Sequence, residues 1–109
     1  MKTVKIKVYG RVQGVFLRAN TKEFCDKVRI KGYVRNCDDG SVEIVACGSE
    51  RDLEKLVGWL KSSPGASRVE NVKVKEIEVE EKFEGFEIRR EDGFLKDKGK
   101  AVGNLFRSI

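Results

Sequence analysis

The stretch from residue 4 to residue 28 restricts the possible folds most, because its hydrophobic period changes once along the chain. In its first part, Val4, Ile6 and Val8 alternate with Lys5, Lys7 and Tyr9, which predicts a strand with one buried face. In its last part, residues typical of a buried helix face recur at helical spacing, at Thr21, Phe24, Cys25 and Val28. Gly10 to Arg18 lies between them, as a strand-to-helix turn with two glycines and an arginine near the helix start.

The rest of the chain continues the alternation of strand and helix patterns. We expect the first helix to run from about Thr21 to a stop at Gly32, then strands at 33–36 and 42–46, joined by the Asp38-Asp39-Gly40 turn. Ser49 reads as the N-cap of a second helix, whose core stripe is Leu53, Leu56, Val57 and Leu60. A fourth strand follows at 69–79, with a bulge or kink near Lys75-Glu76 where the apolar phase shifts. Phe83, Phe86 and Ile88 suggest a short final strand.

This order predicts an α+β fold of the ferredoxin-like type, βαββαβ plus a short C-terminal strand. The sheet is expected to be antiparallel, with both helices on one face. At 109 residues the chain suits a single modest core. We expect residues 1–90 to form the domain and residues 91–109, a Lys- and Gly-rich stretch, to be an extension that is either docked or flexible.

Composition removes several classes of function. The chain has no histidine, which excludes a histidine-based nucleophilic triad and histidine ligation of zinc or iron. Three cysteines without a C-x-x-C pair favour reduced thiols in a cytoplasmic protein. No apolar run is long enough to predict a membrane span. The net charge of +5 favours anionic partners without choosing among phosphate esters, nucleic acid and acidic proteins.

The turn from Gly10 to Arg18 is the first candidate site. Such a turn directs several backbone N–H groups into one hollow, where the positive end of the helix dipole adds to the field. An arginine there offers a planar fork of donors that matches a phosphoryl group. The glycine spacing fits neither the dinucleotide fingerprint nor a P-loop. Glycines between a strand and a helix also serve simple tight turns, so the turn alone leaves both interpretations open.

Asn36 is the second candidate, because the expected topology brings it toward the same edge of the sheet. The first two strands run in the same direction with the third between them, so their C-terminal ends lie roughly 10 Å apart. Asn36 before Asp-Asp-Gly also suits an ordinary turn. No base accompanies Cys37, which argues against a nucleophile. Asp38 and Asp39 in a glycine turn are typical of solvated carboxylates rather than a metal site.

Several segments together resemble the acylphosphatases. Gly10-Arg11-Val12-Gln13-Gly14-Val15 followed by Arg18 is similar to the phosphate-binding signature of that family, and the later segments match in the correct order. These are residues 32–36, 39–42, 62–69 and 83–89. The resemblance covers about residues 4 to 90. It departs at Phe16-Leu17, where many members have a small residue followed by Phe.

The resemblance implies a metal-independent, cofactor-free hydrolase that converts acyl phosphates to a carboxylate and inorganic phosphate. It implies that Arg18 binds the phosphate, that Asn36 orients water, and that backbone amides of the turn hold the phosphoryl oxygens. The implied binding residues are Gln13, Gly14, Val15, Phe16, Leu17 and Arg18. Neither the physiological acyl phosphate nor the oligomeric state follows from the sequence.

Two rival functions come from other classes. RNA-recognition modules share the expected topology, and Lys31-Gly32-Tyr33-Val34 is faintly similar to the start of their sheet motif. Arg35, Asn36 and Cys37 stand where that motif needs stacking rings, so a nucleic-acid partner is not favoured. A phosphate-binding domain without turnover is the second rival.

Overall fold

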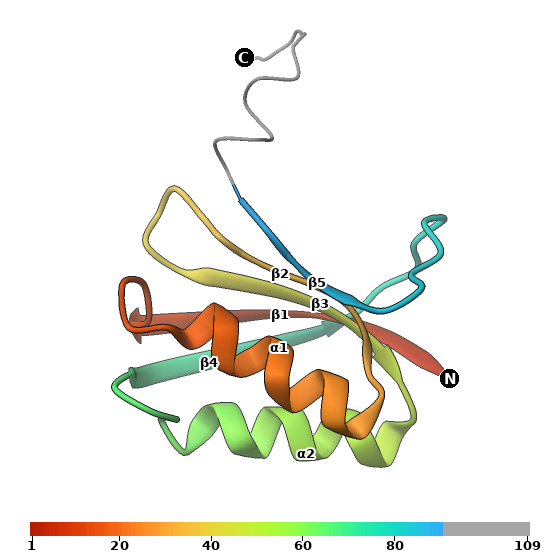
Figure 1. The fold of residues 1–109 in the computed structure, drawn as a ribbon, viewed down its shortest axis with the longest axis horizontal. Helices are drawn as coiled ribbons and strands as arrows, with labels where there is room; N and C mark the ends of the chain where they lie inside the picture. Colours follow the sequence, from red (N-terminus) through yellow and green to blue (C-terminus); the bar gives the residue numbers. More distant parts are fainter. Residues whose placement is uncertain (91–109) are drawn as a thin grey trace, which may run out of the picture.

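The computed structural model describes residues 1–90, so the predicted extension at 91–109 lies outside the described residues. Seven elements follow one another: β1 (Lys2–Arg11), α1 (Leu17–Val28), β2 (Lys31–Asn36), β3 (Val42–Gly48), α2 (Glu50–Lys61), β4 (Arg68–Glu76) and β5 (Phe86–Arg89). Figure 1 shows the two helices lying along the same side of the strands. The predicted order of elements is confirmed, although α1 begins four residues earlier than the apolar stripe suggested.

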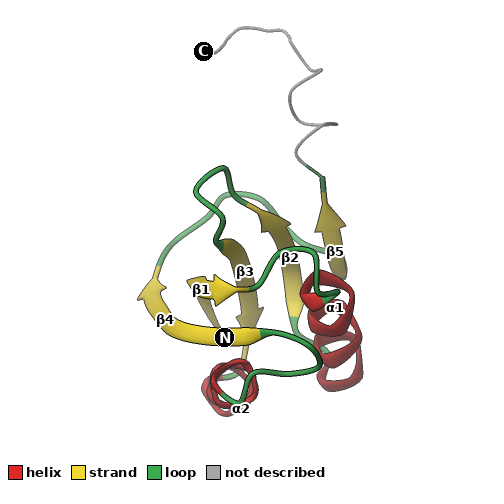
Figure 2. Cartoon of the chain, turned by 90° about the vertical axis from the view of Figure 1, so that its left-hand side faces the viewer, coloured by secondary structure: helices red, strands yellow, loops and turns green. Residues whose placement is uncertain are grey.

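The sheet has the strand order β4-β1-β3-β2-β5. The pairs β1–β4, β1–β3 and β2–β3 are antiparallel, as predicted. The prediction of an antiparallel sheet is wrong for β5, which adds to β2 in parallel, so the five-stranded sheet is mixed. Figure 2 shows the twisted sheet curving over both helices. This is the predicted ferredoxin-like fold, and β3 does lie between β1 and β2 as expected. No helix within residues 1–90 is long and apolar enough to cross a membrane.

The core lies between the sheet and the two helices. Its strand side consists of alternate residues, because only every second side chain of a strand faces the helices: Val4, Ile6, Val8, Val34, Val42, Ile44 and Ala46. Leu53, Leu56 and Leu60 of α2 cover it at helical spacing, as predicted. Phe24 of α1 stacks on Trp59 of α2 with ring centroids 4.7 Å apart, which joins the helices beside the core.

The ends of the helices test two predictions. Ser49 caps α2, since its hydroxyl accepts a hydrogen bond from the Asp52 N–H at 3.1 Å, as expected. The predicted stop of α1 at Gly32 is wrong: the helix ends at Val28, and Arg29 adopts the left-handed conformation with φ 64°. The N–H of Ile30 then donates to the carbonyl of Cys25 at 2.9 Å. A hydrogen-bonded left-handed cap of this kind usually uses glycine, which is why the sequence misdirected the prediction.

Gly32 instead serves the sheet. It lies in β2 with φ 141°, and a Cβ added there would lie 1.8 Å from the carbonyl oxygen of Val45 on β3. We expect Gly32→Ala to lower the free energy of unfolding by about 3 kcal/mol or more, because backbone atoms cannot give way to the methyl group. Urea denaturation measures this loss. Gly40→Ala is the matched control, because Gly40 also has a positive φ but open space around it; an equal loss in both variants would contradict the steric argument.

The predicted bulge near Lys75-Glu76 is also misplaced. The register between β1 and β4 shifts between Tyr9 and Gly10, where the partner residue changes from Asn71 to Val69 and leaves Glu70 as the extra residue. A Cβ on Gly10 would lie 2.2 Å from the carbonyl oxygen of Arg68, so glycine permits the close approach. The extra residue thus lies in β4, opposite the end of β1 that leads into the candidate turn.

Candidate active site

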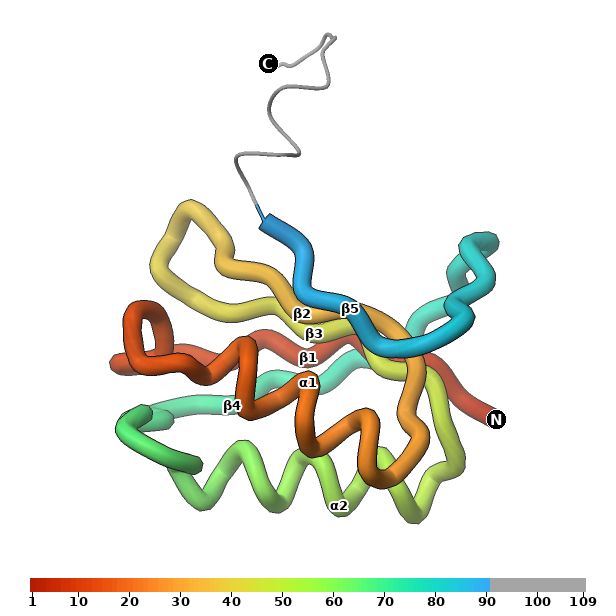
Figure 3. Tube along the Cα trace, in the orientation of Figure 1, coloured from red at the N-terminus to blue at the C-terminus, as the bar shows by residue number. Residues whose placement is uncertain are grey.

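The turn between β1 and α1 lies at the same end of the molecule as the turn between β2 and β3, as the trace in Figure 3 shows. Gln13 joins the two turns: its side-chain amide donates to the carbonyls of Cys37 at 2.8 Å and Ser41 at 2.9 Å. The Gln13 side chain thus fixes the turn in place rather than facing a ligand.

The backbone of this turn is arranged as an anion cradle. Gly14 has φ 75° and Phe16 has φ 63°, so both residues are left-handed. Within residues 1–90, the N–H groups from Gly14 to Arg18 donate to no protein acceptor, and the first main-chain bond of the helix runs from Asn20 to Phe16. These free donors sit at the N-terminus of α1, where the helix dipole favours negative charge.

Arg18 is the second residue of α1 and brings a side-chain charge to the same place. No carboxylate among residues 1–90 pairs with its guanidinium, although the neighbouring strands carry several ion pairs. Leu17 beside it is buried in the core, so the register of the helix places Arg18 at the border between core and cavity. A half-buried, unpaired guanidinium beside free amides favours binding of an anion.

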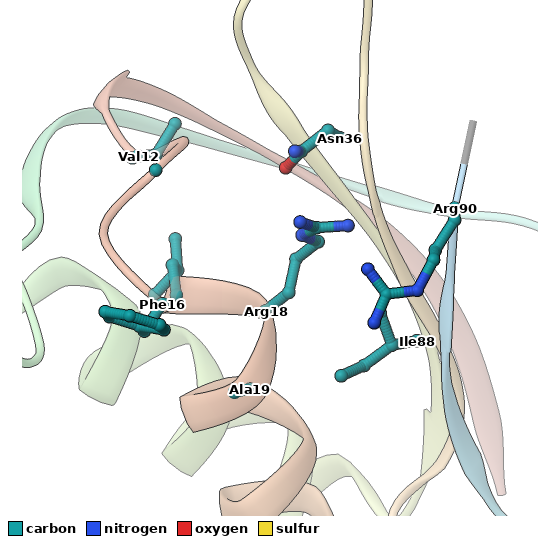
Figure 4. A pocket seen from close by; sticks show the side chains of 9 residues that line it. Val12, Phe16, Arg18, Ala19, Asn36, Ile88 and Arg90 are labelled. Atoms are coloured by element: carbon teal, nitrogen blue, oxygen red, sulfur yellow. The ribbon is translucent and has the colours of Figure 1, made fainter. Parts of the chain in front are cut away.

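Asn36 ends β2 and belongs to the face of the sheet that carries the helices, since it follows Val34 by two residues. Its Oδ1 atom is buried and has no hydrogen-bond partner within residues 1–90. A buried carbonyl oxygen without a partner is unfavourable unless a ligand or water donates a hydrogen bond to it. Figure 4 shows its carboxamide and the Arg18 guanidinium directed toward one another.

These groups meet at a cavity of about 370 Å³. It is lined by Val12, Gly14, Phe16, Leu17, Arg18, Ala19, Asn36, Ile88 and Arg90. Of the binding residues expected from the sequence, Gly14, Phe16, Leu17 and Arg18 line it, whereas Gln13 and Val15 do not. Asn36, the residue expected to orient water, also lines it. Val15 packs against the core cluster instead.

Arg90 is a lining residue that sequence reasoning missed. In the parallel pairing of β2 with β5, Arg35 lies opposite Arg89, so one further step brings Arg90 beside Asn36. Lys22 on α1 holds β5 in place, because its ammonium group donates to the carbonyl of Phe86 at 3.0 Å. The alternation Phe86, Ile88, Arg90 was the only local signal for this position, and its register depends on a distant strand.

The other reactive side chains considered from the sequence lie elsewhere. Cys37 is buried, which agrees with packing rather than with a nucleophile. Asp39 accepts hydrogen bonds from the hydroxyl and the N–H of Ser41. These bonds, together with nearby Lys7, lower the pKa of the Asp39 carboxyl. No group of three or more potential metal-ligating Cys, Asp or Glu side chains occurs within the described part of the chain.

The open face of the sheet is occupied by internal contacts. Arg89 lies 4.1 Å from the centre of the Tyr33 ring, and the Tyr33 hydroxyl donates to Glu43 at 2.9 Å. Burial opposes ionisation of Glu43, but hydrogen bonds from Arg35 and Tyr33 outweigh it and lower the Glu43 pKa. Tyr33 is thus covered, and it does not offer the free ring that base stacking on a sheet requires.

Comparisons with known proteins agree with this geometry. Residues 4–88 match the family model for acylphosphatase. The structure is similar to that of an acylphosphatase from Bacillus subtilis, with a TM-score of 0.77 and 38% identity, covering 82% of this chain and 99% of that one. An acylphosphatase from Coxiella burnetii gives a TM-score of 0.76 and 35% identity, covering 81% and 92%. HypF from T. kodakarensis gives 0.72 and 31%, covering 82% of this chain but 12% of that larger chain.

Proposed function

This chain belongs to the acylphosphatase family, and we propose that the cavity beside Arg18 is where it acts. Acylphosphatases hydrolyse the carboxyl–phosphate bond of acyl phosphates to a carboxylate and inorganic phosphate, and this is the activity of the present chain. One observation carries the assignment of the site: the buried Oδ1 of Asn36 and the guanidinium of Arg18, both without a partner among residues 1–90, lie at the same cavity.

The first step is binding of the phosphoryl group. Its oxygens accept hydrogen bonds from the amides of Gly14 to Arg18, while the Arg18 guanidinium neutralises a second edge of the anion. The charge of the transition state is spread over the equatorial oxygens of the phosphoryl group, so donors fixed in advance stabilise it without reorganisation. Gln13 contributes by holding the turn that carries these donors.

The second step is in-line attack by water. The Oδ1 of Asn36 accepts a hydrogen bond from the water and aligns its oxygen with phosphorus. A bond forms between water and phosphorus while the bond from phosphorus to the carboxyl oxygen breaks, and the electron pair leaves with the carboxylate. Because the chain has no histidine and no carboxylate of residues 1–90 lines the cavity, a phosphoryl oxygen accepts the proton. A carboxylate is a good leaving group, so positioning and charge stabilisation suffice.

Two further features belong to the proposal. Catalysis needs no metal, since Asp39 is committed to Ser41 and Lys7, while the guanidinium of Arg18 and the carboxamide of Asn36 line the cavity. The location is cytoplasmic, which the free thiols of Cys25, Cys37 and Cys47 support. Burial raises the pKa of Cys25 to about 12, so that thiol stays protonated and unreactive.

Hydrolysis of benzoyl phosphate tests the function and its metal independence together. We expect equal amounts of benzoate and inorganic phosphate, with an unchanged rate after dialysis against EDTA, because arginine and amide donors replace the Lewis acid. Ultraviolet absorbance follows loss of the acyl phosphate, and a phosphate assay follows the second product. Loss of activity in EDTA with recovery on adding Mg²⁺ would contradict the metal-free mechanism and direct attention to Asp38 and Asp39.

A further inference from the structure

Phe16 has one feature that contributes nothing to folding and one that opposes it. Its side chain is 80% exposed to solvent, and its backbone is left-handed, with φ 63° and ψ 20°. Residues other than Gly, Asn and Asp rarely adopt this conformation, and for a bulky residue it is a real outlier. Strain of this kind clusters at sites of function.

The backbone requirement of the turn does not explain the aromatic ring. The left-handed conformation directs the amides of the cradle, but glycine supplies it more easily, as Gly14 does two residues earlier. The position needs no side-chain cap, because Phe16 makes none. Within residues 1–90 the ring is also absent from the hydrophobic core and from the residues packed against it. The ring therefore serves neither the turn nor the described core.

The proposed reaction tells where such a ring would act. In an in-line displacement the leaving group departs on the side of phosphorus opposite to the water. With the water held by Asn36, the acyl group must extend away from Asn36 and past the turn. Figure 4 shows the Phe16 ring on the far side of the cavity from Asn36, with the Arg18 guanidinium closer to Asn36.

We propose that Phe16 binds the acyl group of the substrate and gives this enzyme a preference for aromatic or extended apolar acyl groups. This rests on the function proposed above. The ring offers an exposed apolar face beside the phosphoryl site, and an aromatic acyl group would stack on it or pack against its edge. An acetyl group is too short to cover the ring, so the contact discriminates between the two substrate classes.

The test compares benzoyl phosphate with acetyl phosphate in Phe16→Gly and Phe16→Tyr. We expect Phe16→Gly to lower the ratio of kcat/KM for benzoyl over acetyl phosphate about three- to tenfold, the range for an aromatic contact. Phe16→Tyr retains the ring and should retain the ratio. Because glycine removes the backbone strain, the thermal midpoint of Phe16→Gly should stay unchanged or rise. Phe16→Asn also removes the ring and tolerates the left-handed conformation. It therefore controls for the extra flexibility that glycine gives the turn.

The outcomes separate the inference from the function on which it rests. A fall of both kcat/KM values by the same factor would overturn the inference and assign Phe16 to the shape of the cradle. An unchanged ratio in Phe16→Gly and Phe16→Asn would also overturn it. If the unaltered protein hydrolysed neither substrate, the proposed function itself would be overturned. Val79→Ala, at an exposed apolar residue outside the cavity, controls for general loss of surface hydrophobicity and should leave the ratio unchanged.

Discussion

Replacement of Arg18 by alanine should lower kcat/KM for benzoyl phosphate by about 10³-fold or more, the scale seen when an arginine that stabilises a transferring phosphoryl group is lost. The guanidinium has no carboxylate partner within residues 1–90, so its charge is available to the substrate in full. The same change should weaken competitive inhibition by inorganic phosphate, because product and transition state share the phosphoryl oxygens.

Steady-state kinetics with phosphate as inhibitor measure both effects. Arg18→Lys keeps the charge but loses the planar fork, and we expect it to recover part of the phosphate affinity and little of kcat. Arg51→Ala is the matched control, since Arg51 is an exposed arginine in the first turn of α2, outside the cavity. Retention of most of the activity by Arg18→Ala would remove the central element of the proposed site.

Local patterns were sufficient to predict the parts of this protein that depend on neighbouring residues in sequence. The alternation of Val4, Ile6 and Val8 predicts β1 because a strand has only two faces. The position of Asn36 follows from topology alone, since a helix between β1 and β2 forces the two strands to run in the same direction. The resemblance of residues 4–90 to one family then implied which of these residues act.

Features that depend on contacts between distant strands could not be predicted in this way. The residues around Gly32 in sequence indicate a helix stop. Glycine is required there instead because the carbonyl of Val45, on another strand, leaves no space for a side chain. Arg90 becomes part of the cavity only through the parallel register of β5 with β2. The side-chain contacts of Gln13 are a third case, because its amide donates to two carbonyls of a turn more than twenty residues away.

Replacement of Asn36 by alanine should lower kcat by about 10²-fold, by analogy with the loss of one oriented polar group in an active site. It should leave phosphate inhibition nearly unchanged, because the proposed partner of Asn36 is the attacking water and not the phosphoryl group. The Oδ1 atom has no partner within residues 1–90, so its removal leaves no described acceptor or donor unsatisfied. The stability of the fold should therefore be maintained or slightly raised.

Pairing kcat with the phosphate inhibition constant distinguishes this role from a binding role. If inhibition collapsed while kcat survived, Asn36 would bind the phosphoryl group and the roles assigned to the two side chains would be reversed. Asn36→Asp sharpens the distinction, because it keeps an acceptor for water but sets a negative charge beside Arg18 and the anion. We expect this variant to weaken phosphate inhibition strongly, unlike Asn36→Ala. Together the two variants separate alignment of water from attraction of the phosphoryl group, which are the roles proposed for Asn36 and Arg18.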